Sequence, residues 1–79
     1  MYKDPSNHDR ATWAKAALDA FAAQTGQDRA GDERETIIQD LLTDLMHLAD
    51  HSDPKIDFAI VLMRASGHYD EEVEEEKTV

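Results

Sequence analysis

Hydrophobic residues recur along this chain at helical spacing, in three segments separated by short polar stretches. In the first segment, about residues 9–25, apolar positions return every three or four residues, as on one face of a helix. Ser6 or Asn7 is placed to cap its start, and Thr25-Gly26 to end it, because glycine readily adopts the left-handed conformation of a C-terminal cap. The apolar positions are Trp13 and Phe21, which we expect to anchor the core, with Ala14, Ala17, Leu18 and Ala22.

The second segment, about residues 33–51, carries the clearest helical pattern. Its apolar residues cover about half of the circumference of a helix with 100° per residue. Asp32, followed three residues later by Glu35, is typical of a capping box. A short polar loop over residues 27–31 is expected before it. The apolar residues are Ile37, Ile38, Leu41, Leu42, Leu45, Met46, Leu48 and Ala49.

The third segment, about residues 54–69, begins with Asp53-Pro54. Asp is a preferred N-cap residue and Pro is preferred at the first helical position. The run from Phe58 to Met63 is apolar without a break, which also fits a buried strand, since Ile and Val favour sheets. No second strand is available for pairing, and we therefore expect a helix.

A helix that is apolar on all sides must be covered on all sides, and two helices of the same chain do not easily achieve this. The third segment therefore predicts a homodimer. A tight three-helix bundle with one exposed Ile or Val is the alternative, because single exposed aliphatic residues are common. The expected fold is an all-α bundle of three helices, dimeric, with its dimer interface at Phe58, Ile60, Val61 and Met63.

The two ends of the chain are expected to be less ordered than the helical domain at 9–69. Residues 1–8 are polar and predict a flexible N-terminus. Residues 70–79 form an acidic tail that we expect to fray after about Glu72. Carboxylates at the C-terminal end of a helix oppose its dipole, which favours this fraying.

The chain is strongly acidic, with 18 Asp and Glu against 8 Lys and Arg, a net charge of −10. Nucleic acids and anionic membranes repel such a chain, and we expect no direct contact with either. Residues 32–57 hold eight acids and two bases, a net −6, and residues 70–76 hold a further six acids. If helical, the first of these segments carries one net charge per about 6.5 Å, against about one per 1.7 Å in duplex DNA.

This acidity points to a basic protein surface as the partner, because charge complementarity steers association. The main hypothesis is a non-enzymatic protein-binding module that contacts a nucleic-acid-binding protein. The alternative is a structural homodimer whose charge only maintains solubility. The candidate partner-binding residues are Glu33, Asp40, Asp44, Glu71, Glu72, Glu74, Glu75 and Glu76.

One side of the second predicted helix carries carboxylates and imidazoles at i, i+4, i+7 and i+11. Side chains of these types bind divalent metals, which gives a metal-dependent hydrolase as an alternative function. The competing interpretation is a solvated surface, since the stripe lies opposite the apolar face. The four residues are Asp40, Asp44, His47 and His51.

Other enzyme classes have less support in the sequence. Helical nucleotide pyrophosphatases hold magnesium with acidic clusters on neighbouring helices. Glu33 and Glu35, with Asp40 and Asp44, supply one such cluster but no second one inside the fold. The absence of Cys excludes disulfides and Cys/His zinc sites, and no cofactor is expected. No apolar segment approaches the length of a membrane span, and we expect a cytoplasmic protein.

The segment Asp40–Asp50, followed by Asp57-Phe58 and His68-Tyr69, resembles small acidic helical proteins encoded on bacterial phages, plasmids and other mobile elements. Trp13, Phe21 and Thr25-Gly26 fit the same pattern, so the resemblance covers about residues 10–72. It assigns no residue a role. It implies an accessory or inhibitor protein that blocks a host protein, of the anti-CRISPR or anti-restriction type.

Overall fold

The structure is a computed structural model, and residues 4–77 are described. All regular secondary structure within those residues is helical, which confirms the all-α class and makes the strand alternative for residues 58–63 wrong. The helices are α1 (Asn7–Thr25), α2 (Gln27–Ala30), α3 (Arg34–Asp50) and α4 (Phe58–Lys77).

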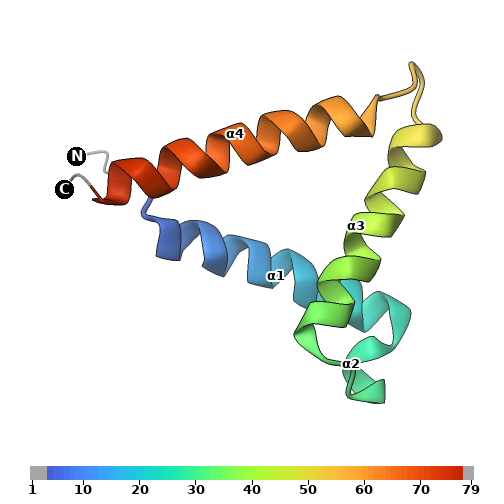
Figure 1. The fold of residues 1–79 in the computed structure, drawn as a ribbon. Coiled ribbons are helices and arrows are strands. Elements are labelled where there is room, and N and C mark those ends of the chain that lie inside the picture. The colour runs from blue at the N-terminus through green and yellow to red at the C-terminus, as the bar shows by residue number, and fades with distance from the viewer. Residues whose placement is uncertain (1–3, 78–79) are drawn as a thin grey trace.

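The three long helices form the sides of an open triangle (Figure 1). α1 contacts α3 near one of its ends and α4 near the other, and a loop over residues 51–57 joins α3 to α4. The sequence predicted a three-helix bundle, but within one chain these helices meet near their ends and do not pack along their lengths. The chain is accordingly expanded, with a radius of gyration of 15.1 Å.

The start and end of α1 follow the sequence closely. Ser6 caps the helix in a capping box, in which the backbone N–H of Asp9 donates to Ser6 Oγ at 3.1 Å and that of Ser6 donates to the Asp9 carboxylate at 3.0 Å. Gly26 ends the helix with φ of 83°, as expected. The polar stretch expected to be a loop contains the single turn of α2, whose N-cap is the same Gly26.

The starts of the other two helices correct the sequence predictions. α3 lies within the predicted range, but its N-cap is Glu33 without a side-chain cap, and the capping box at Asp32 is wrong. α4 begins at Phe58, not at Pro54. Asp57 Oδ1 accepts hydrogen bonds from the backbone N–H groups of Ala59 (3.1 Å) and Ile60 (3.4 Å). Asp57 therefore supplies the capping oxygen expected from Asp53.

Little of the apolar surface is buried in the single chain. One small cluster lies where α1 meets α3, formed by Leu18, Ala22 and Ile37, with Phe21 and Leu41 partly buried against it. α4 contains no buried residue among those described. Trp13, expected in the core, is 61% exposed.

Gly26, at the C-cap of α1, and Gly67, inside α4, give a matched test of the helix boundaries. A Cβ at Gly26 or at Gly67 would meet no atom within 4 Å, so a methyl group fits at both sites. Gly26→Ala forces alanine into a left-handed conformation and should lower the free energy of unfolding by about 1 kcal/mol. Gly67→Ala lies inside α4 and should raise it by about 0.5–1 kcal/mol. Urea denaturation measures both; a stabilising effect of Gly26→Ala would contradict the α1 boundary.

Candidate functional site

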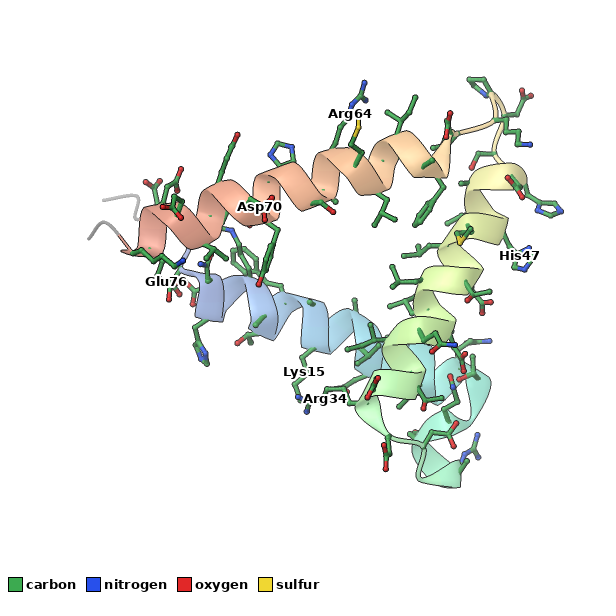
Figure 2. All side chains as sticks on the ribbon, viewed as in Figure 1. Lys15, Arg34, His47, Arg64, Asp70 and Glu76 are labelled. Atoms are coloured by element: carbon green, nitrogen blue, oxygen red, sulfur yellow. The ribbon has the colours of Figure 1, made fainter. Side chains whose placement is uncertain are left out.

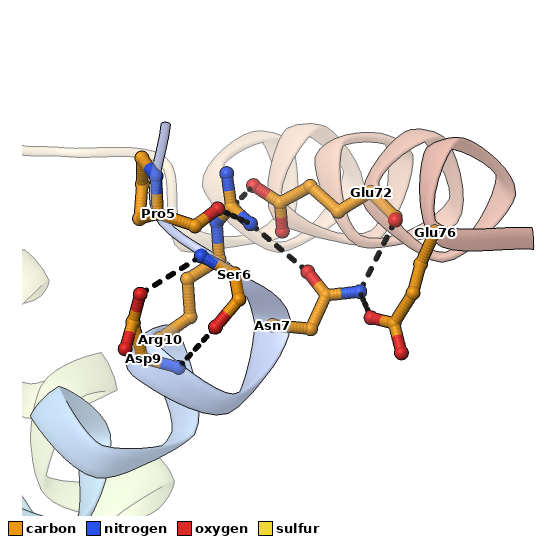
Figure 3. A network of polar contacts seen from close by, with 7 residues as sticks. All are labelled: Pro5, Ser6, Asn7, Asp9, Arg10, Glu72 and Glu76. Atoms are coloured by element: carbon orange, nitrogen blue, oxygen red, sulfur yellow. Dashed lines mark hydrogen bonds and ion pairs between the residues drawn. The ribbon is translucent and has the colours of Figure 1, made fainter. Parts of the chain in front are cut away.

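The acidic end of α4 is held against the start of α1 by a network of polar contacts (Figure 3). Arg10 Nε lies 3.0 Å from Glu72 Oε2, in an ion pair about one-third exposed on both sides. Asn7 Nδ2 donates to the backbone carbonyl of Glu72 at 3.1 Å and also to the Glu76 carboxylate. The tail expected to fray after Glu72 is therefore helical to Lys77. Residues 78–79 of the predicted tail lie outside the described residues.

The same network orders the start of the chain. Arg10 Nη1 donates to the carbonyl of Pro5 and to Asn7 Oδ1, each at 3.0 Å, which fixes the guanidinium that faces Glu72. Ser6 caps α1, and Asn7 and His8 form its first turn. Within the N-terminal segment predicted at residues 1–8, Asn7 and His8 therefore belong to α1, which begins two residues earlier than predicted, while residues 1–3 lie outside the described part.

The bracing turns residues 70–76 into a fixed acidic array. Of its six carboxylate residues, Glu72 is half-buried and the others are exposed, and Val73 is half-buried. Seven helical residues span about 10 Å, so the array carries about one carboxylate per 1.7 Å of helix. Such an array can bind a cation or a basic protein surface. The carboxylate residues are Asp70, Glu71, Glu72, Glu74, Glu75 and Glu76.

The carboxylates predicted on α3 lie elsewhere. Asp40 is half-buried and accepts a hydrogen bond from Gln27 Nε2 at 2.7 Å, so it is engaged within the chain. Glu33 and Asp44 are exposed. α1 separates this region from the end of α4 by its full length, about 28 Å for 19 residues. The eight predicted partner-binding residues therefore form two separate acidic regions, not one surface.

The carboxylate and imidazole stripe lies on one side of α3, as its spacing predicted. His47 points away from the interior of the triangle (Figure 2). His51 Nδ1 lies 2.8 Å from the carbonyl oxygen of His47, and Asp40 contacts Gln27 as described above. Within residues 4–77, no group of three or more Asp, Glu and His side chains is placed to hold a metal ion.

An apolar groove lies between α1 and α3, a feature that the sequence analysis missed because it assigned these residues to a closed core. Its volume is about 330 Å³. Two basic side chains, Lys15 and Arg34, lie along it and extend into the same region in Figure 2. Its apolar lining includes Ala11, Ala14 and Leu18 from α1 and Ile38, Leu42 and Leu45 from α3.

The predicted dimer interface on α4 divides into two parts. Phe58 is half-buried at the start of the helix. Ile60, Val61 and Met63 are 41%, 43% and 67% exposed. Because these three side chains are exposed and α4 has no buried residue, they are accessible for contact with another molecule.

Comparison with known proteins adds no homologue to this description. No protein-family model, curated protein or solved structure matches the chain. Within residues 4–77, no helix combines the length and the apolar character that crossing a membrane requires. The function is therefore argued from the residues of this chain.

The bracing contact predicts a local effect of Arg10→Gln. Loss of the ion pair should lower the opening free energy of the end of α4 by about 1 kcal/mol and speed amide hydrogen exchange there about fivefold. Exchange at residues 73–77, measured by NMR, reports the change. Arg29→Gln, in α2 beyond the far end of α1, removes the same charge and is the control. Equal exchange rates in both variants would contradict the bracing role.

Proposed function

We propose that this chain is a non-enzymatic protein-binding module that contacts a basic, nucleic-acid-binding protein through the acidic end of α4. The observation that carries the proposal is the continuation of α4 to Lys77, held against α1 by Arg10 and Asn7. A helix held in this way presents its carboxylates in a fixed arrangement. Less conformational entropy is then lost on binding than for a frayed tail.

The spacing of charge supports a partner that normally binds nucleic acid. Residues 70–76 carry six carboxylates, and with Glu72 paired to Arg10 they present about one net charge per 2 Å of helix, close to the about one per 1.7 Å of duplex DNA. The residues 32–57, with one net charge per about 6.5 Å, are much less dense. The end of α4 is therefore the better competitor for a basic groove.

The α3 carboxylates take a secondary part in this proposal. Asp40 is held by Gln27, and breaking that hydrogen bond would oppose its use in binding. Glu33 and Asp44 lie at the other end of α1 and contribute long-range attraction more than direct contact. They therefore serve as a control region that has the same charge chemistry.

The resemblance to mobile-element proteins suggests the class of target. A protein that occupies the nucleic-acid groove of a host CRISPR or restriction protein would block it by charge competition, in the cytoplasm where these systems act. Such binding requires no catalytic residue and no cofactor. Its rate and affinity should fall steeply with salt, because the contact is electrostatic.

The test compares two double variants that remove the same number of charges. Immobilised wild-type protein is used to capture proteins from a lysate of the source organism, with quantification by mass spectrometry. E71Q/E74Q should reduce capture of the specific partner about tenfold, through two lost charge contacts of about 0.7 kcal/mol each. E33Q/D44N should leave capture nearly unchanged.

A second measurement establishes the nature of the partner. Short duplex DNA added to the captured complex should displace the partner, because both compete for one basic groove. The proposal fails if no captured protein distinguishes the two double variants. It also fails if the captured protein binds DNA and the acidic chain at the same time.

A further inference from the structure

The accessible surface of this chain is too large for a folded monomer of its size. It measures 6819 Å². A compact monomer of 8.9 kDa exposes about 4,800 Å² by the usual scaling with mass. The difference is about 2,000 Å² per chain, or about 4,000 Å² for two chains. Obligate homodimers bury about 2,000–5,000 Å² in total.

The dimensions of the chain point to the same conclusion. A compact domain of 79 residues has an expected radius of gyration of about 11.6 Å, against 15.1 Å for this chain. A compact particle of twice that length has an expected radius of about 15 Å. One chain therefore already has the radius of gyration of a compact dimer. Two copies can share that radius only if their helices interdigitate.

The missing contacts lie on complementary elements. α4 has no buried residue, although its first half is apolar on all sides, and the groove between α1 and α3 is open and apolar. The loop at 51–57 joins α3 to α4 at the corner of the triangle (Figure 1), and no residue of α4 is among the described residues that line the groove. We propose that a second copy of this chain covers the groove, with α4 of each copy in the α1–α3 groove of the other.

The charge distribution allows this contact despite a net charge of −10 on each chain. The charged residues that line the groove are Lys15 and Arg34, both basic, and Lys15 Nζ also pairs with the exposed Asp19 carboxylate at 2.7 Å. The carboxylates are concentrated in the last turns of α4, beyond the apolar run of Phe58 to Met63. An incoming α4 therefore brings apolar residues to an apolar floor, where the two charged lining residues are both basic.

The proposed dimer is symmetric, because each copy supplies the same helix and the same groove. Packing of α4 against α1 and α3 of the partner would complete, between two chains, the three-helix bundle expected from the sequence. This proposal stands independently of the proposed function, since it uses the first half of α4 and not its acidic end.

The first test is the mass in solution, by sedimentation equilibrium across the micromolar range. The wild-type chain should sediment at twice 8.9 kDa. Leu42→Asp, which places a carboxylate on the groove floor, should shift the protein to monomer. Thr43→Asp introduces the same charge at the next residue, outside the groove lining, and should remain dimeric. A wild-type monomer, a larger oligomer, or a dimeric Leu42→Asp variant overturns the proposal.

A second test does not depend on whether Leu42→Asp folds. Because the chain contains no Cys, each single-Cys variant carries one thiol, and any disulfide joins two chains. In each experiment an isotope-labelled variant is mixed with unlabelled Ile60→Cys, so that disulfides between the two variants are recognised by mass. The mixture with Leu42→Cys should form several times more 42–60 disulfide than the mixture with Thr43→Cys forms 43–60 disulfide. Equal yields in the two mixtures overturn the placement of α4 in the groove of the partner.

Discussion

The burial of apolar surface is the constraint on which the rest of this structure depends. A chain of 79 residues without Cys has neither disulfides nor length to compensate for a small core. In the open triangle, the residues buried together reduce to a cluster of Leu18, Ala22 and Ile37 where α1 meets α3. Helix propensity and capping can form the individual helices, but they do not fix the angles between them. Those angles are fixed by the end contacts and by whatever covers the inner faces.

Charge and apolar character are separated along the same helix, and this separation allows two kinds of association. The first half of α4 is apolar, and its last turns hold the densest carboxylates of the chain. Close carboxylates repel one another and oppose the helix dipole. Arg10 and Asn7 offset part of that cost by binding Glu72 and Glu76. We therefore propose different associations for the two ends of α4, a second copy for the apolar end and a basic partner for the acidic end.

The local boundaries show where sequence reasoning succeeded and where it failed. Gly26 was predicted correctly and Ser6 is one of the two N-caps that the sequence offered beside Asn7, because caps depend on a few neighbouring residues. The start of α4 was predicted wrongly, because Asp53 and Asp57 both suit an N-cap and the sequence offers no means of choosing between them. The tail that was expected to fray after Glu72 is helical to Lys77, and Arg10, more than sixty residues earlier, lies beside Glu72. Trp13 fits a core position by spacing, although it is 61% exposed in the single chain.

The sequence by itself determined the helical class, the three long helices and the division of charge, since all three follow from spacing and composition. Only the tertiary structure decided that the acidic end of α4 is a braced array, that Asp40 is engaged by Gln27, and that an apolar groove opens between α1 and α3. The physical reason is the range of the interactions. Helical periodicity and capping act over a few residues, whereas an ion pair from Arg10 to Glu72 and a groove between two helices depend on how distant segments meet in space.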